Sequence, residues 1–196
     1  MQGMAPMGVF VAILGVLSLR VDGSSCPSGI SVVPNLDLSR YEGTWYEVAS
    51  QNLGVLSACS CSRYLFKMTS DDTFDDRFSC TKGGKPGGID LTLKGKIPNT
   101  TVPAKMVESP MFSWLPSAPY WVVEVGKDYE YAVVYACVPI AGEYIYIFHR
   151  DSQALSKKLI DVETISSKLT AMGVDASQVK VVSHSSCEYP TELVVV

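Results

Sequence analysis

Between Tyr41 and Arg150, apolar and polar residues alternate in short segments rich in β-branched and aromatic residues, and turn residues separate the segments. The turn signals are Asp71-Asp72, the GGKPGG run at 83–88, Asn99, Gly126-Lys127-Asp128 and Gly142. Such a pattern is typical of strands joined by hairpins. It predicts strands at 44–50, 62–68, 73–80, 89–97, 104–109, 120–125, 131–138 and 144–150. Eight strands with hairpin-length links favour an all-β fold, a closed antiparallel up-and-down barrel.

The period of the apolar positions changes after residue 151. From Ser152 to Met172 they recur every three or four residues, which predicts an amphipathic C-terminal helix. The apolar stripe consists of Leu155, Leu159, Val162, Ile165, Leu169 and Met172. Ser152 can cap the start of this helix and Gly173 can end it. A short final strand at 179–184 then leads to Cys187.

An apolar run at residues 8–19 precedes the predicted strands and is too short to span a bilayer as a helix. Small residues follow it from Gly23, which predicts a cleaved signal peptide over 1–23 and one domain over 24–196. No Lys or Arg precedes the run, so an uncleaved anchor is the alternative. No second run is long enough to span a membrane, and we expect the mature chain to be secreted to the extracellular space without a membrane span.

Composition excludes several classes of function. The 196 residues are 47% hydrophobic, which is enough for one domain with a sizeable core. The net charge is −4 with both signs interspersed, so the basic face that nucleic acid requires is not expected. His149-Arg150-Asp151 matches a kinase tripeptide without the asparagine expected at position 156, and no G-x-S-x-G nucleophile motif occurs. We therefore expect neither an enzyme nor a catalytic cofactor.

The six cysteines all follow the predicted leader, as expected for disulfides in an exported protein. Their spacing alone leaves about 15 pairings open. Zinc held by Cys59, Cys61 and Cys80 is an alternative that the oxidising compartment and the C-x-C spacing disfavour, so no metal is expected. Asn99-Thr100-Thr101 is a glycosylation sequon between two prolines, where a surface loop is expected.

Three stretches in this order resemble the lipocalin family: Gly43-Thr44-Trp45, DYEYAVVYAC at 128–137 and YIFHRD at 146–151. Within the family, residues 118–125 look like the apolipoprotein D branch, and residues 59–66 and 185–190 look like the crustacyanins. The resemblance implies that Trp45 closes the narrow end of the barrel. It also implies that Arg150 packs over the indole ring.

The same resemblance implies two disulfides, Cys26–Cys137 and Cys59–Cys187. Cys61 and Cys80 then remain. They lie almost symmetrically about the Asp71-Asp72 turn, so we expect them to face each other across adjacent antiparallel strands.

Strand alternation, with Trp45 facing inward, predicts the ligand-binding lining of the barrel. The predicted lining residues are Glu47, Ala49, Ser62, Tyr64, Phe66, Trp121, Tyr146 and Phe148. The inward position of Trp121 depends on which alternate residues of its strand face the interior. The other choice places Tyr120 inside and turns the Trp121 indole against the helix. This mostly aromatic lining suits a flat or elongated apolar molecule with one polar end.

The resemblance implies a secreted carrier of a small hydrophobic ligand. Its crustacyanin-like features favour a carotenoid pigment, while a bilin, fatty acid, steroid or retinoid is the alternative. A carotenoid is longer than one such barrel is deep, so we expect a homo- or heterodimer through the loop from Met111 to Trp121. Two other classes are a lipocalin-fold isomerase with a reactive cysteine and a protein-binding lipocalin with a filled barrel.

Overall fold

Eight strands form the barrel that the sequence pattern predicts. The computed structural model describes residues 26–27, 29–52, 59–82, 88–109, 117–138 and 142–189. The barrel strands are β1 (Gly43–Gln51), β2 (Cys59–Met68), β3 (Thr73–Lys82), β4 (Asp90–Lys96), β5 (Lys105–Ser109), β6 (Ala118–Val125), β7 (Tyr131–Val138) and β8 (Gly142–His149). The predicted leader and residues 111–116 of the predicted dimer loop lie outside the described residues.

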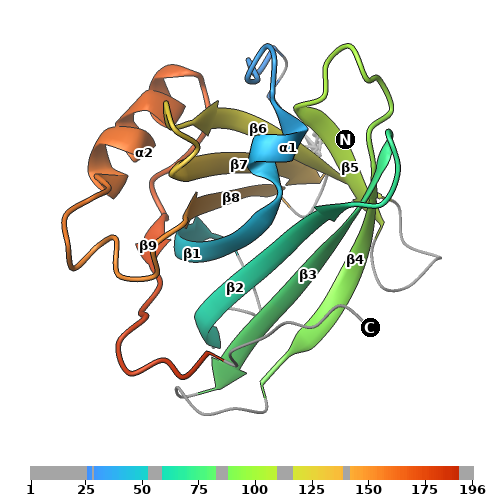
Figure 1. Cartoon of the computed structure of the whole chain (residues 1–196). Helices are drawn as coiled ribbons and strands as arrows, with labels where there is room; N and C mark the ends of the chain where they lie inside the picture. The colour runs from blue at the N-terminus through green and yellow to red at the C-terminus, as the bar shows by residue number, and fades with distance from the viewer. Residues whose placement is uncertain are drawn as a thin grey trace, which may run out of the picture.

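The barrel is closed because β1 pairs with both β2 and β8 (Figure 1). Every other barrel strand pairs with its neighbours in the sequence, and all of these pairings are antiparallel. This is the up-and-down order expected for short hairpin links.

Three further elements flank the barrel: α1 (Leu38–Tyr41), α2 (Val162–Ala171) and β9 (Lys180–Val181). The strand β9 pairs with β1 in antiparallel fashion at Ala49 and Ser50 and is shorter than the predicted strand at 179–184. Gly173 has a φ of 86°, in the left-handed region that glycine adopts without strain, and α2 ends beside it as predicted.

The predicted start of the helix at Ser152 was wrong. The chain forms turns before Ile160, and α2 begins after Asp161, whose Oδ1 accepts a hydrogen bond of 3.0 Å from the backbone N–H of Thr164. Lys158 has a φ of 55°, which no continuous helix allows. Leu159, part of the predicted stripe, is 55% exposed. The spacing of Leu159 fits a helix, but the carboxylate of Asp161 caps the helix better than Ser152 does, so the helix starts after Asp161.

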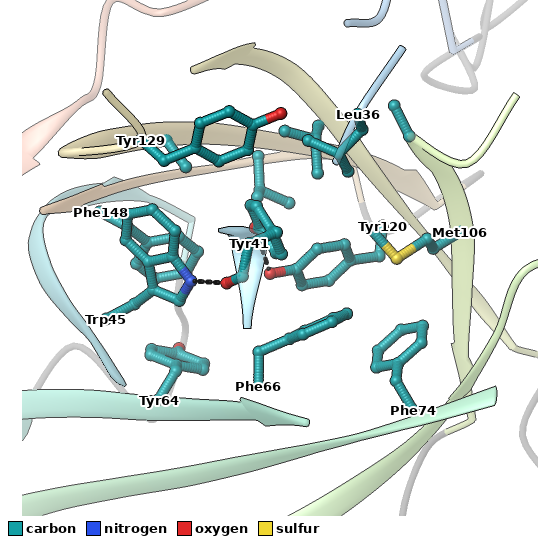
Figure 2. Packing of buried hydrophobic residues seen from close by; sticks show 14 of the residues in the cluster. Leu36, Tyr41, Trp45, Tyr64, Phe66, Phe74, Met106, Tyr120, Tyr129 and Phe148 are labelled. Atoms are coloured by element: carbon teal, nitrogen blue, oxygen red, sulfur yellow. Dashed lines mark hydrogen bonds between the residues drawn. The ribbon is translucent and has the colours of Figure 1, made fainter. Parts of the chain in front are cut away.

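Aromatic side chains fill the closed half of the barrel. Phe66 stacks on Phe74 with ring centroids 4.5 Å apart, and Tyr41 packs against both Trp45 and Phe66 (Figure 2). The Tyr41 and Tyr120 hydroxyls share a hydrogen bond of 2.8 Å, so these buried polar groups are satisfied. This cluster gives the barrel a solid floor.

A second core lies between the barrel and α2. Ile165 and Leu169 of α2 pack with Val133, Tyr135 and other outward-facing residues of β1, β7 and β8. Figure 1 shows α2 lying against one side of the barrel. The alternating strands therefore bury both faces there, which explains why their apolar pattern is nearly continuous.

All six cysteines form disulfides, but two of the expected pairs were wrong. Cys26 is bonded to Cys137 as the resemblance implied, whereas Cys59 is bonded to Cys80 and Cys61 to Cys187. The register of β2 against β3 shifts between Ser60 and Arg63, and Cys61 has a φ of 57°. This bulge breaks the two-residue alternation, so Cys59 and Cys61 do not share a face.

Cys59, Cys61 and Cys80 are each in a disulfide, so none of them has a thiolate that could bind zinc. Among the described residues, no helix combines the length and the apolar character needed to cross a membrane.

Candidate functional site: the barrel cavity and its closed end

Trp45 and Arg150 close the barrel at the end where β8 finishes. The Arg150 guanidinium carbon lies 3.4 Å from the centroid of the Trp45 indole ring, a cation–π contact. The indole Nε1 donates a hydrogen bond of 2.9 Å to the Tyr41 carbonyl (Figure 2). Gly43 has a φ of 102°, and a Cβ there would lie 3.3 Å from Arg150 Nη1, so glycine allows the close approach.

The guanidinium also joins separate segments of the chain. Arg150 donates hydrogen bonds of 2.8 to 3.4 Å to main-chain oxygens, which belong to Arg40, Tyr41, Glu42, Thr44 and Tyr129. Burial lowers the pKa of Arg150 to about 10, so the group remains charged at neutral pH. Its role is to hold the floor, and the N–H groups that make these bonds are not free to meet a ligand.

An apolar cavity of about 510 Å³ lies above this floor. Its volume is within the range of roughly 300 to 1,000 Å³ usual for small-molecule sites. Seven of the eight barrel strands line it, through Tyr64, Phe78, Leu91, Leu93, Glu108, Ala118, Pro119, Tyr120, Val134, Ala136, Val138, Tyr144, Tyr146 and Phe148. Tyr144 is near the start of β8, so the cavity extends toward the end of the barrel opposite Arg150.

Three of the predicted lining residues, Tyr64, Tyr146 and Phe148, line this cavity. The Tyr64 ring packs against Phe148 with centroids 4.9 Å apart. Phe66 lies deeper, in the aromatic cluster of the floor. Ser62 is buried but is not among the lining residues.

The structure places Ala49 and Trp121 outside the barrel, contrary to prediction. The register of β1 against β8 shifts between Glu47 and Ala49, so Ala49 lies opposite Ile147 and packs in the core beneath α2. Trp121 packs against Tyr135 on the same outer side. Parity therefore turns the neighbouring residue, Tyr120, into the cavity.

Sequence reasoning missed most of the lining from β3 to β7. Alternation carried along β3 places Phe74, Asp76 and Phe78 inward, and extending the same parity to β4 gives Leu91 and Leu93. Unbroken alternation along β3 and β4 is the signal that identifies these inward-facing residues. Glu108 is the lining residue that changes the chemistry most.

Glu47 is a buried carboxyl beside the cavity and is fully inaccessible to solvent. The hydroxyl of Tyr64 donates to Glu47 Oε2 at 3.1 Å. Burial raises the pKa of Glu47 to about 7, and contacts with Ser50 and Tyr64 oppose this shift only in part. The side chain therefore titrates near neutral pH.

Asp76 and Glu108 form a second acidic site. They lie on β3 and β5, which β4 separates in the sheet. Burial raises the pKa of Asp76, although a hydrogen bond with Glu108 opposes the shift. For Glu108, burial and the negative charge of Asp76 both raise the pKa. Both shifts favour a proton shared by the pair, with Glu108 as the donor and Asp76 as the acceptor.

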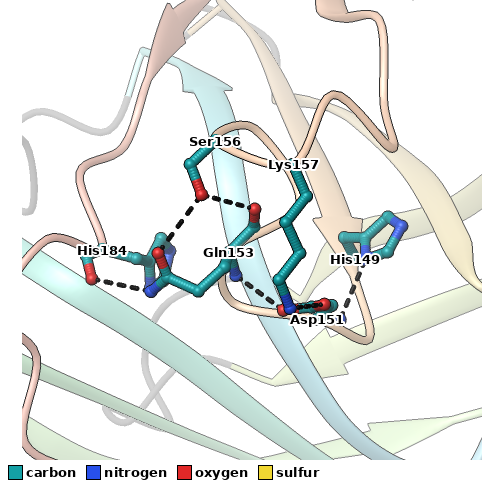
Figure 3. Close-up of polar contacts among 6 residues, drawn as sticks. All are labelled: His149, Asp151, Gln153, Ser156, Lys157 and His184. Carbon is teal, nitrogen blue, oxygen red and sulfur yellow. Dashed lines mark hydrogen bonds and ion pairs between the residues drawn. The ribbon is translucent and has the colours of Figure 1, made fainter.

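The two histidines have structural contacts at separate places (Figure 3). His149 Nδ1 accepts a hydrogen bond of 2.8 Å from the Asp151 backbone N–H, and His184 Nε2 lies 2.7 Å from the carbonyl oxygen of Glu47. Figure 3 also shows Gln153 Nε2 bonded to the His184 carbonyl, at 3.2 Å. Within the described ranges, no cluster of three or more His, Cys, Asp or Glu is arranged to hold a metal ion.

Asn99 lies on an exposed turn between β4 and β5. Its Oδ1 accepts hydrogen bonds from the Thr101 N–H at 3.0 Å and the Thr101 hydroxyl at 2.7 Å. The sequon is accessible, and its modification stays a prediction.

Comparison with known proteins gives one consistent group. A family model described as a Lipocalin-like domain matches residues 36–184. Apolipoprotein D of Mus musculus is 29% identical over 201 residues, covering 94% of this chain and 98% of the relative. Apolipoprotein D of Rattus norvegicus is 27% identical over 196 residues, with the same shares covered.

Solved structures give the same fold. Insecticyanin from the tobacco hornworm Manduca sexta superposes with a TM-score of 0.64 at 19% identity, covering 85% of this chain and 91% of the other. Lobster apocrustacyanin A1 has a TM-score of 0.56 at 20% identity, covering 76% and 81%.

Proposed function

Because this chain belongs to the lipocalin family, we propose that it binds a small hydrophobic molecule in the barrel cavity and carries it outside the cell. The observation that carries this proposal is the apolar cavity of about 510 Å³ above a closed floor. Burial of an apolar ligand there removes its surface from water, which is the main source of affinity at such sites. The three disulfides support an extracellular location, where they are stable.

A carotenoid is the ligand we favour. Six aromatic rings surround the cavity, and ring faces give a conjugated chain dispersion contact at little polar cost. The crustacyanin-like features of the sequence favour the same class. A carotenoid longer than the barrel would protrude at the Tyr144 end, and a dimer through the loop from Met111 to Trp121 is our proposal for covering it.

Two observations weigh against the other functional classes. The isomerase alternative needs a reactive thiol, whereas all six cysteines are in disulfides. A purely protein-binding lipocalin with a filled barrel does not account for the open cavity. The site supports reversible binding as the better function.

The test is titration of the purified protein with a hydroxylated carotenoid, biliverdin, retinol and a fatty acid. We expect the carotenoid to bind with a shifted visible absorption and quenched tryptophan fluorescence. Tyr146→Ala, which removes a lining ring, should weaken this binding at least tenfold while the thermal melt stays cooperative. Tyr131→Ala, on the outer side of the barrel, is the matched control and should bind as the wild type does. If none of the four ligands binds, the carrier proposal is wrong.

A further inference from the structure

The interior of the barrel contains three carboxyl groups from three different strands: Glu47 of β1, Asp76 of β3 and Glu108 of β5. Glu47 is 0% exposed and Asp76 is 1% exposed. Glu108 lines the cavity itself, and its Oε1 is shielded from solvent. Buried carboxyls are costly to a fold unless they are hydrogen-bonded, so their presence requires an explanation.

Most of the oxygens of this carboxyl cluster have no hydrogen-bond donor. Tyr64 donates to one oxygen of Glu47. Among the described residues, no N–H group or hydroxyl donates to Glu47 Oε1, to either Asp76 oxygen or to Glu108 Oε1. Two ionised carboxylates offer only acceptors, so Asp76 and Glu108 bond each other only when they share a proton. That proton satisfies one bond and leaves acceptors unused. The three carboxyl groups are therefore short of donors.

The cavity is also short of positive charge. None of the described residues that line it is Lys, Arg or His. The guanidinium of Arg150 is at the closed end, stacked on Trp45 and bonded to main-chain oxygens. A ligand carboxylate would meet Glu108 and no basic partner among the described lining residues.

We propose that the cavity selects ligands whose polar end donates a hydrogen bond to Glu108 of the Asp76–Glu108 pair, with a protonated amine held more tightly than a hydroxyl and a carboxylate rejected. An ammonium brings three N–H donors and a positive charge, both of which the carboxyl cluster lacks. A hydroxyl brings one donor and no charge. This inference rests on the proposed function, because it concerns the same cavity, and it narrows the ligand class.

Three probes with the same naphthyl body separate the effect of the polar end of a ligand from that of its apolar body. The probes are 2-(1-naphthyl)ethylamine, 2-(1-naphthyl)ethanol and the anion of 1-naphthylacetic acid. Each is titrated into the purified chain by calorimetry at pH 7.5. We expect the amine to bind at least tenfold more tightly than the alcohol, and the acetate at least tenfold more weakly. Equal affinities, or tightest binding of the acetate, would overturn the inference and leave the carrier function intact. Absence of binding by all three would overturn the inference and also count against the carrier function.

The variant test uses isosteric amides. Asp76→Asn with Glu108→Gln should reduce the preference for amine over alcohol to under threefold, while the alcohol affinity changes by less than threefold. Retained alcohol binding shows that the barrel is folded. Glu124→Gln is the control, because Glu124 is bonded to Lys168 and Tyr131 outside the cavity, and it should keep the full preference. A preference that survives in the double variant would show that the carboxyl pair does not set selectivity.

Proton release gives a second readout. Burial raises the pKa of both Asp76 and Glu108, and a bound cation favours their ionised forms. The other titratable groups that interact with this pair are four tyrosine hydroxyls whose pKa values burial raises, so they are neutral at this pH: Tyr41, Tyr64, Tyr120 and Tyr146. Amine binding at pH 7.5 should therefore release protons, seen as a dependence of the binding heat on buffer ionisation enthalpy. Alcohol binding should show no such dependence, and an amine heat independent of buffer would contradict the proposed pairing.

Discussion

At the scale of single residues, Trp45 couples the first strand to the segment after the last one. Its ring is buried and lies under the Arg150 guanidinium. We expect Trp45→Ala to lower the free energy of unfolding by about 3 to 5 kcal/mol, because it leaves a cavity and removes the stacking partner of Arg150. Denaturant unfolding followed by circular dichroism measures this loss.

Trp121→Ala is the matched control for the floor. Its indole lies on the outer side of the barrel and is only partly buried, so the loss should be smaller. A loss for Trp45→Ala below that of the control would show that the floor is not the main anchor.

Glu47 makes stability depend on pH in a direction that is opposite to that of most surface carboxylates. Its pKa rises from 4.5 to about 7 in the folded protein, so the folded state binds the proton more tightly than the unfolded state does. Its contribution is fully present below the unfolded pKa and is lost as pH rises through about 7. We expect Glu47→Gln to be more stable relative to wild type at pH 8 than at pH 5, by up to about 3 kcal/mol. Unfolding curves at the two pH values test this.

The pH comparison needs a control because Asp76 and Glu108 also make stability fall as pH rises. They do so in the wild type and in Glu47→Gln alike. Glu163→Gln, on the exposed face of α2, should keep the wild-type difference between the two pH values. Parallel pH profiles for wild type and Glu47→Gln would show that Glu47 titrates alike in the folded and unfolded states.

At the scale of elements, the start of α2 depends on one carboxylate. Asp161 accepts hydrogen bonds from the N–H and the hydroxyl of Thr164. Asp161→Ala should lower the free energy of unfolding by about 0.5 to 2 kcal/mol, the usual cost of losing an N-cap. Asp161→Asn keeps an acceptor and should recover most of that loss. Equal effects of the two substitutions in denaturant unfolding would exclude capping as the reason.

The strands were predictable from the sequence because each keeps its own alternation and ends at a turn signal. The faces of the strands were predictable only where alternation is unbroken, as from Tyr64 to Phe66 or from Tyr146 to Phe148. A bulge is a tertiary feature without a sequence pattern of its own at these positions. One bulge turned Ala49 outward, and the other separated Cys59 from Cys61.

Trp121 shows a different reason for error. Residues 120 and 121 are both aromatic, so composition did not favour either parity, and contact with the second core decided the outcome. The acidic pair was not predictable from the sequence for a similar reason. Asp76 and Glu108 are 32 positions apart in the sequence, and only the order β3-β4-β5 brings them together.

At the scale of the whole molecule, the disulfide pairing has a direct chemical test. The double variant Cys59→Ser with Cys80→Ser should be secreted without free thiols, because it removes one complete bridge. Cys59→Ser with Cys187→Ser breaks two bridges and should expose two thiols to titration in denaturant. The reverse result would restore the pairing implied by the resemblance.

The two long-range bridges also determine what a cut in the backbone does. Cys26–Cys137 and Cys61–Cys187 enclose overlapping lengths of chain, with sequence separations of 111 and 126. Any single break between Cys26 and Cys187 falls within at least one of these covalent loops. A nicked molecule would therefore run as one band on a non-reducing gel and as two after reduction. Topology alone makes this barrel a single covalent body even after its chain has been cleaved once.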